Sequence, residues 1–373
     1  MEKKDKNLNV PNLRFPEFSG EWERYLLKNI TNIYDGTHQT PKYTKSGVPF
    51  MSVEDVTQKS SKEQKYISEQ DFQNDFHNPP QKGDILMTRI GDIGTPCIVP
   101  TNEALGYYVS LALIRPLEKL QSCFLNYVIQ SNSFKRELYK RTIHVAFPQK
   151  INKEDIGKCK LDVPSIEEQS RIGDLLSLID ERIETQKKII EKYESLIRGL
   201  CEQLTRQGTK NKAINECLDC HTSTLQESTV SGTGEYPVYG ATGVCGYTNF
   251  NDVKDDGILI IKDGASVGTT YYARGSYSHI GTLNRLTARK GVNLRYVYYC
   301  LKVMNFAPYK TGLAIPHIYF KDYGKHRIWC PSYEEQLHIA NILTQIDDKI
   351  HVEKSLLEQL NSQKRYMLNQ LFI

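Results

Sequence analysis

The sequence predicts an α+β protein in which two globular α/β units are separated by two long antiparallel coiled-coil helices. The whole chain forms an internal repeat with approximate two-fold symmetry. Three observations predict this fold: a long segment recurs 167 residues later, both copies carry a heptad pattern, and the blocks before them combine short strands with glycine-rich turns. The predicted boundaries are a globular domain at 1–163, a helix at 164–207, a globular domain at 208–330 and a helix at 331–373.

The repeat is clearest where each helix begins. "PSIEEQSRIGDLLSLID" (164–180) recurs as "PSYEEQLHIANILTQID" (331–347), and the register of 167 holds without a gap from Ile151 to the chain end. A repeat of this length indicates duplicated structure. Ser165 and Ser332 are the expected N-caps, followed by acidic residues in the first turn.

Apolar residues in both copies recur with the alternating spacing of four and three that is typical of a coiled-coil seam. Two amphipathic helices packed separately on the domains are the alternative. The predicted seam consists of Ile172, Leu176, Ile179, Ile183, Gln186, Ile190, Ile339, Leu343, Ile346, Ile350, Glu353 and Leu357.

The two helices are expected to be antiparallel. A helix over 166–206 is about 60 Å long, and a parallel pair would require residues 207–330 to stretch back over that length. Because short connections are the rule, the antiparallel pair is favoured. End-to-end pairing then brings Gln186 beside Glu353, and we expect this polar pair to fix the register.

The two globular blocks resemble each other in outline. "GDILMTRIGDIGTPCIV" (83–99) and "DGILIIKDGASVGTTYY" (256–272) both predict a strand, a basic residue, a glycine-rich turn and a second strand. The glycines suit positive φ angles or close backbone approach. Helical stretches are expected at 122–142 and 293–304.

Composition restricts the classes of function. Residues 1–163 hold 23 Lys and Arg against 20 Asp and Glu, and residues 208–330 hold 14 against 9, whereas the repeated helices are acidic. This distribution suits an anionic partner bound by the two blocks. The absence of a long apolar run or a signal-peptide core predicts a cytoplasmic protein without a membrane partner, and nine scattered cysteines indicate reduced thiols.

Polar, aromatic and basic residues gather in the predicted loops of both blocks. Lys and Arg suit phosphates, whereas His, Gln, Thr and Tyr reach base edges. The candidate DNA contacts are Thr37, His38, Thr40, Lys42, Tyr43, Arg89, Lys140, Arg141, His144, Gln149, Lys150, Tyr239, Thr242, Tyr247, Lys262, Ser266, Thr269, Tyr271, Lys310 and His317.

Two short motifs suggest chemistry but are better explained as structure. "HNPPQ" (77–81) resembles an amino-methyltransferase motif, yet Gln81 replaces the aromatic residue that would stack on a flipped base. "CLDCH" (217–221) fits haem attachment or half a zinc site, but no second ligand pair is near. No GxxxxGK[ST] occurs. We therefore expect no catalytic residue, no metal site and no cofactor on this chain.

The opening "VPNLRFPEFSGEWERYLLKNI", the "DGTHQTPKY" loop, the "PxxEEQ" helix start and the repeat together resemble the specificity (S) subunit of type I restriction–modification systems. The resemblance implies that 1–163 and 208–330 are target recognition domains, each reading half of a bipartite double-stranded DNA site. It also implies a helical spacer, two docked methyltransferase subunits and further restriction subunits.

The same resemblance places S-adenosylmethionine, ATP and Mg²⁺ on those partner subunits. The helix starts, Glu167–Gln169 and Glu334–Gln336, are candidate docking points. The "LRFPEF" opening has no counterpart after residue 207, so the second domain is expected to begin differently.

Two other classes of function remain as alternatives: a self-sufficient DNA methyltransferase or nuclease, and a coiled-coil scaffold that does not bind DNA. Binding of S-adenosylmethionine by the isolated chain would favour the first alternative. Salt-dependent DNA affinity separates our interpretation from the second.

Overall fold

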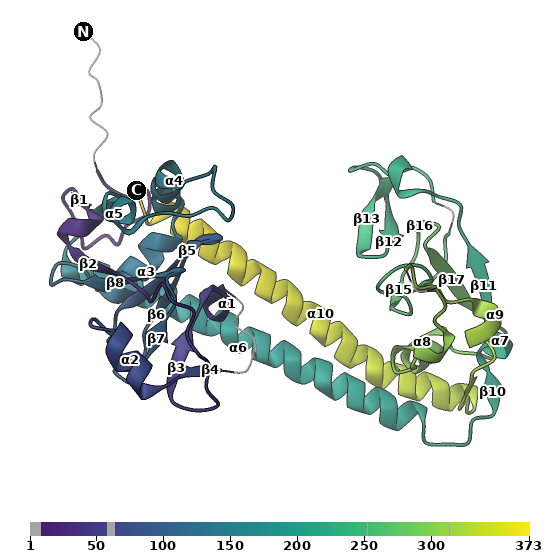
Figure 1. Cartoon of the computed structure of the whole chain (residues 1–373). Helices are drawn as coiled ribbons and strands as arrows, with labels where there is room; N and C mark the ends of the chain where they lie inside the picture. Colours follow the sequence, from purple (N-terminus) through teal and green to yellow (C-terminus); the bar gives the residue numbers. More distant parts are fainter. Residues whose placement is uncertain (1–8, 58–63, 252, 313) are drawn as a thin grey trace, which may run out of the picture. The chain divides into compact units, whose positions relative to one another are not determined.

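The computed structural model describes residues 9–57, 64–251, 253–312 and 314–373. The chain divides into two compact units, each of which contains parts of both long helices. Unit 1 takes its described residues from Met1–Thr185 and Leu357–Ile373, and unit 2 comprises those within Gln186–Leu356. The long helices are α6 (Ile166–Thr205) and α10 (Tyr333–Gln370) (Figure 1).

Unit 1 contains three sheets. The four-stranded sheet has the order β2-β8-β5-β6, the three-stranded sheet the order β4-β3-β7, and β1 pairs with β9. The strands are β1 (Glu23–Leu26), β2 (Thr31–Asp35), β3 (Val48–Met51), β4 (Lys65–Ile67), β5 (Ile85–Ile90), β6 (Asp92–Ile98), β7 (Gly106–Tyr107), β8 (Leu111–Pro116) and β9 (Lys160–Val163). The helices are η1 (Leu27–Asn29), α1 (Val53–Thr57), α2 (Glu69–Asp75), α3 (Ser122–Gln130), α4 (Asn132–Arg141) and α5 (Lys153–Gly157).

Unit 2 repeats this topology, with orders β11-β17-β14-β15 and β13-β12-β16 and the pair β10-β18. Its strands are β10 (Lys212–Ala213), β11 (Leu218–Thr222), β12 (Tyr236–Gly240), β13 (Gly243–Thr248), β14 (Gly257–Ile261), β15 (Thr270–Ala273), β16 (Ser278–His279), β17 (Leu283–Ala288) and β18 (Arg327–Ile328). Its shorter helices are α7 (Ile214–Cys217), η2 (Glu227–Thr229), α8 (Leu294–Lys302), η3 (Ala307–Tyr309) and α9 (Phe320–Tyr323).

The predicted strand pairs around the glycine turns are present in both units. In unit 1 β5 pairs with β6, and in unit 2 β14 pairs with β15. Gly91 and Gly264, which follow these first strands, have φ angles of 80° and 102°. A side chain rarely adopts such angles, so glycine permits the chain to reverse there.

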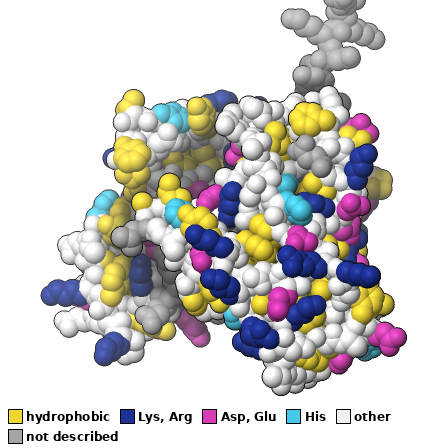
Figure 2. Space-filling view, turned by 90° about the vertical axis from the view of Figure 1, so that its right-hand side faces the viewer, with side chains coloured by type: hydrophobic (Ala, Val, Ile, Leu, Met, Phe, Trp, Pro, Cys, Tyr) yellow, Lys and Arg dark blue, Asp and Glu magenta, His cyan; other side chains and the backbone are white. Residues whose placement is uncertain are grey.

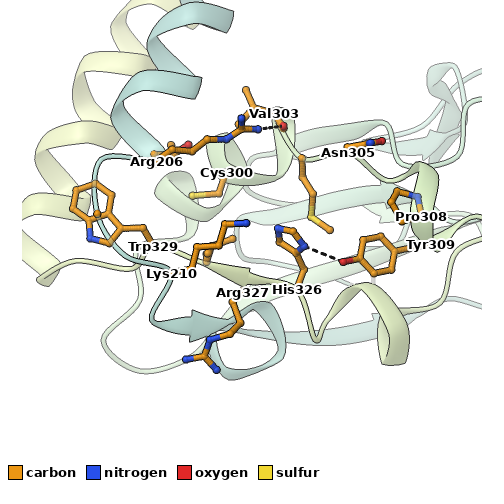
Figure 3. A pocket seen from close by; sticks show the side chains of 14 residues that line it. Arg206, Lys210, Cys300, Val303, Asn305, Pro308, Tyr309, His326, Arg327 and Trp329 are labelled. Carbon is orange, nitrogen blue, oxygen red and sulfur yellow. Dashed lines mark hydrogen bonds between the residues drawn. The ribbon is translucent and has the colours of Figure 1, made fainter.

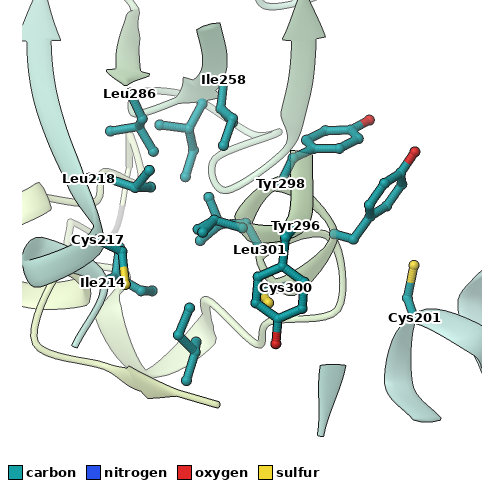
Figure 4. Close-up of a cluster of buried hydrophobic side chains, with 14 of the residues drawn as sticks. Cys201, Ile214, Cys217, Leu218, Ile258, Leu286, Tyr296, Tyr298, Cys300 and Leu301 are labelled. Atoms are coloured by element: carbon teal, nitrogen blue, oxygen red, sulfur yellow. The ribbon is translucent and has the colours of Figure 1, made fainter. Parts of the chain in front are cut away.

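The hydrophobic core of unit 2 lies between its four-stranded sheet, α8 and the two long helices. Ile258 and Leu286 project from the sheet, Tyr296 and Leu301 come from α8, and Cys201 comes from α6 (Figure 4). Burial of these apolar side chains is the main source of stability. The long helices are therefore held by the domain core as well as by each other.

Both predicted N-caps of the long helices are confirmed. The amide of Glu168 donates to Ser165 Oγ, and the amide of Glu335 donates to Ser332 Oγ, each over 3.3 Å. The next residue but three after each N-cap serine, a glutamine, makes a second hydrogen bond that both units share. The amide of Gln121 donates to Gln169 Oε1, and the amide of Asn293 donates to Gln336 Oε1, each over 2.9 Å. Each glutamine thus joins its long helix to the start of an earlier helix of the same unit, α3 in unit 1 and α8 in unit 2.

The predicted antiparallel seam is confirmed within each unit. In unit 2 Ile197 and Cys201 of α6 lie in one buried cluster with Ile339 and Leu343 of α10, whereas Gln186 contacts Glu353. In unit 1 Asp180 pairs with Lys364 over 2.7 Å. Of the twelve predicted seam residues, ten are buried, and Ile346 and Leu357 are partly buried.

No helix in the described part of the chain combines the length and the apolar character needed to cross a membrane.

Candidate nucleic-acid interface

In unit 1 the turn between β5 and β6 is joined to the loop that follows α4. The amide of Gly91 donates to Gln149 O over 2.8 Å, and the amide of Ile151 donates to Arg89 O over 3.0 Å. These bonds hold Gln149 and Lys150, both exposed, beside the turn. The structure thus brings together three of the predicted contact residues.

Arg89 itself points inward. Its side chain is 8% exposed, Nη2 lies 3.1 Å from Asp35 Oδ1, and Nε donates to Val109 O over 2.7 Å. Lys153 Nζ lies 3.5 Å from the other Asp35 oxygen. The guanidinium of Arg89 thus holds the segments around Asp35 and Val109 in place. In this conformation it offers little surface to a base.

The predicted loop at 37–43 begins two residues after Asp35, and the amide of Val109, whose carbonyl Arg89 contacts, donates to Thr37 O over 3.0 Å. Thr37 is buried, and its amide donates to Tyr107 O over 3.2 Å. Tyr43 packs edge-on against Phe50, with Lys65 Nζ 5.4 Å from its ring centre. His38, Thr40 and Lys42 are exposed. This loop therefore belongs to the three-stranded sheet.

Lys140 and Arg141 end α4 and flank the other side of the loop. Both pair with Glu137, over 3.0 and 2.9 Å. Partial burial opposes ionisation of Glu137, but hydrogen bonds from the Lys160 amide and Lys140, with attraction by Arg141, outweigh it and lower the pKa of Glu137. His144 lies with its ring centre 4.4 Å from that of Tyr139. The cationic heads remain at the surface, with Lys140 the more exposed.

The tip of the same loop carries two apolar residues that sequence reasoning missed as candidates. Val145 and Phe147 are essentially fully exposed. Apolar side chains in this situation are found where proteins insert wedges between base steps. The feature of the sequence that could have indicated this exposure is an aromatic residue before a proline, Phe147–Pro148, inside a basic loop.

Unit 2 repeats the loop linkage. The amide of Gly264 donates to Pro316 O over 2.9 Å, and the amide of Ile318 donates to Lys262 O over 3.0 Å. His317, adjacent to Pro316, lies 3.9 Å from Asp263, and Ile315 is 62% exposed. Lys310 is exposed before this loop. Each unit thus carries a basic loop with an exposed apolar residue at the same topological position.

The remaining predicted contacts of unit 2 lie on or near the β12–β13 hairpin and the turn before β15. Tyr239 packs edge-on against Tyr277, and Tyr271 donates its hydroxyl hydrogen to Ala241 O over 3.1 Å. Thr242 and Tyr247 are exposed. Ser266 and Thr269 are also exposed, in the turn that contains Gly264.

The docking points predicted at the helix starts are partly wrong. Glu168, Gln169 and Gln336 are all nearly fully buried and bonded inside their own units. Glu167, Glu334 and Glu335 remain exposed. The repeated "EEQ" is therefore explained largely by internal hydrogen bonding.

The "CLDCH" motif does not assemble ligands. Cys217 is buried, His221 Nε2 bonds Thr287 Oγ1 over 2.9 Å, and burial raises the pKa of Cys220 to about 11. Within the described ranges, no group of three or more metal-ligating side chains occurs.

On the face shown in Figure 2, Lys and Arg side chains are interspersed with Asp and Glu, without one large basic patch. This mixture agrees with the small net charge of +4. Phosphate contacts on this face should therefore be few and local.

Comparison with known proteins identifies relatives over the whole chain. The family "Type I restriction modification DNA specificity domain" matches residues 19–195 and 209–362. A putative type I restriction enzyme MjaX specificity subunit of Methanocaldococcus jannaschii is 24% identical over 98% of this chain and 96% of its own length. The EcoprrI specificity subunit of Escherichia coli is 26% identical over 30% of this chain and 28% of its own length.

Solved structures agree on the fold. The type I restriction–modification S subunit from M. genitalium has a TM-score of 0.69 at 17% identity, covering 98% of this chain and 99% of that one. A chain from a structure of type I R-M complex assembly has a TM-score of 0.53 at 17% identity, covering 93% of this chain and 96% of that one.

Proposed function

Because the chain belongs to the family of type I restriction modification DNA specificity domains, we propose that it reads a bipartite double-stranded DNA site, one half-site per unit. The observation that carries this proposal is the recurrence of one loop linkage, Gly91–Gln149 and Gly264–Pro316, in two units whose loop sequences differ. Because the backbone hydrogen bonds recur while the loop side chains differ, the two units can present different contacts to two different half-sites.

One unit alone would bind weakly, since a good bidentate base contact discriminates by about 1–3 kcal/mol. Linking two units makes the second contact intramolecular and raises avidity by roughly 10²–10⁴. We propose that α6 and α10, which each run through both units, set the distance between half-sites. Inserting seven residues into both helices, about 10 Å, should change the preferred gap. Methylation at the old spacing would contradict this role.

The proposal assigns the chemistry to partner subunits. Two methyltransferase subunits and the restriction subunits would bring S-adenosylmethionine, ATP and Mg²⁺. The structural explanation of "HNPPQ" supports this division. Pro79 O accepts a hydrogen bond from Arg115 Nη2 over 2.9 Å, and the Gln81 amide donates to Asp84 over 2.8 Å. The motif serves as a braced turn.

The decisive experiment exchanges residues 208–330 for the corresponding block of another family member. We expect genome-wide mapping of methylated adenines to show one half-site changed and the other retained. Change in both half-sites would contradict reading by separate units. S-adenosylmethionine binding by the isolated chain would instead favour a self-sufficient methyltransferase, and absence of salt-dependent DNA affinity in the complex would favour a scaffold.

A further inference from the structure

The N-terminal segment of unit 1 fills a position that has an open counterpart in unit 2. Trp22 is 3% exposed, with its ring centre 5.9 Å from that of Phe124 and its indole donating to Glu168 over 3.3 Å. Arg14 pairs with the same carboxylate over 2.7 Å, and Leu13 N donates to Gln370 O over 3.0 Å. Residues 9–22 therefore act as a peptide seated on the helix ends.

What remains of the space in unit 1 is a cavity of about 20 Å³. Five of its lining residues lie within the gapless repeat: Lys160, Leu161, Asp162, Phe372 and Ile373. The register of 167 relates them to Arg327, Ile328, Trp329, Thr205 and Arg206. All five of these residues line one cavity of about 350 Å³, called the unit 2 cavity below (Figure 3).

Two differences in sequence open the unit 2 cavity. The chain passes from Thr205, at the end of α6, to Lys212 in β10 without a segment resembling "LRFPEF". In addition, the small residue Thr205 stands where unit 1 has Phe372, whose ring centre lies 5.5 Å from that of Phe124. The unit 2 cavity is thus the same seat without its peptide.

The charge of the unit 2 cavity differs from that of unit 1. It is lined by Arg206, Lys210, His326 and Arg327, and the described lining residues include no carboxylate. At the Trp329 position unit 1 has Asp162, which accepts hydrogen bonds from Asn9 and Arg24. The unit 2 cavity therefore selects a negatively charged occupant, whereas in the unit 1 seat Arg14 of the seated segment pairs with the carboxylate of Glu168.

The lining also has an apolar side, formed by Val303, Met304, Pro308 and Trp329. Such a surface suits an inserted apolar or aromatic side chain, as small concave sites generally do. A phosphate backbone would leave these groups without a partner. Together with the peptide in the equivalent seat, the apolar side favours a protein segment over nucleic acid.

We propose that the unit 2 cavity receives a segment of the methyltransferase subunit that carries one apolar or aromatic side chain flanked by carboxylates. The identity of this partner rests on the proposed function. The apolar side chain lies against Met304, Pro308 and Trp329, and the carboxylates face Arg206 and Lys210. Because unit 1 fills its own seat, the two docking positions on this chain are unequal.

The test measures binding of purified methyltransferase subunit to the full-length chain by isothermal titration calorimetry without DNA. Thr205→Phe introduces the side chain present at position 372, and Lys210→Glu reverses one lining charge. We expect each variant to weaken one of two binding steps at least tenfold. Lys290→Glu, an exposed position of unit 2 outside the cavity, should bind as the unchanged chain does.

Thr205→Phe should not lower the melting temperature, since it fills space that unit 1 fills. If it fails to fold, Lys210→Glu alone decides. Unchanged binding of Lys210→Glu at both steps overturns the inference. Loss of DNA affinity with intact subunit binding assigns the cavity to phosphate and also overturns it. If the unchanged chain binds no methyltransferase subunit, the proposed function fails together with this inference.

Discussion

Gln186 donates a hydrogen bond from Nε2 to the backbone oxygen of Glu353 over 3.1 Å and a second one to its carboxylate. The two residues are related by the internal repeat and meet in an otherwise apolar seam. Lys349 also reaches the carboxylate, over 2.6 Å. Hydrogen bonds from Lys349 and Gln186 lower the pKa of Glu353. This polar contact thus aligns α6 with α10, because a change of register between the two helices would break its hydrogen bonds.

Replacing both residues, Gln186→Leu with Glu353→Leu, should loosen the register without lowering the melting temperature, because apolar pairs replace buried polar ones at little cost. Gln186→Leu alone should lower the melting temperature, because it removes one hydrogen-bond partner of Glu353. The register can be measured as the distribution of distances between spin labels attached at Glu194→Cys and Lys354→Cys, two positions whose side chains pair across the seam, with Nζ 2.6 Å from Oε1. An equally narrow distribution in both backgrounds would contradict a register role.

A second prediction concerns the N-terminal segment. Glu168 is buried and held by Arg14 and Trp22, so Arg14→Ala leaves a buried charge with reduced compensation. We expect a loss of about 3–5 kcal/mol in unfolding free energy, measured by urea denaturation. Arg171→Ala is the matched control, because its pair with Glu17 is exposed and 3.7 Å long. A loss below about 1 kcal/mol for Arg14→Ala would show that the segment is only loosely seated.

The contrast between the units shows what could be predicted from the sequence. Periodicity and N-cap chemistry are local, so the seam, Ser165 and Ser332 follow from residue order alone. The absence of a second "LRFPEF" was visible too. Its consequence was not, because the seat that the segment fills in unit 1 is formed by packing between distant residues, such as Trp22 and Phe124, which are more than a hundred residues apart.

Arg89 illustrates the same limit within the candidate interface. A basic residue before a glycine turn looks like a phosphate contact, but the carboxylate of Asp35 turns it inward. Sequence spacing cannot reveal that pairing, because the two residues lie on different strands, β2 and β5, which do not hydrogen-bond to each other. Exposure of Phe147 was equally hidden, since aromatic residues are usually buried.

A third prediction separates the two half-sites. Lys150→Ala in unit 1 and Lys310→Ala in unit 2 each remove one exposed cation beside a recurring loop. Each should weaken DNA binding by the complex and reduce the slope of log affinity against log salt by about 1. Lys82→Ala and Lys290→Ala serve as exposed controls in the same units. An unchanged slope for both loop variants would place the phosphate contacts elsewhere.

The last prediction concerns His326, at the floor of the unit 2 cavity. Burial, with repulsion by Lys210 and Arg206, lowers the pKa of this imidazole. The other titratable or charged groups lining its cavity are Tyr309, which bonds its Nδ1 over 2.9 Å, Arg327 and Cys300. In the unfolded chain the pKa is about 6.5. The folded state therefore takes up this proton less readily, and stability falls as the pH drops below that value.

Lys210→Ala removes one repelling charge and should raise the pKa of His326. Histidine ring signals followed by NMR across pH 4–8 measure this directly, assigned through loss of one signal in His326→Gln. Lys290→Ala should leave the titration unchanged. An acidic segment in the cavity should also raise the pKa, because a nearby carboxylate favours the imidazolium. If the midpoint stays fixed in Lys210→Ala, the lysine does not face the imidazole, and the cationic lining of the cavity is smaller than the geometry indicates.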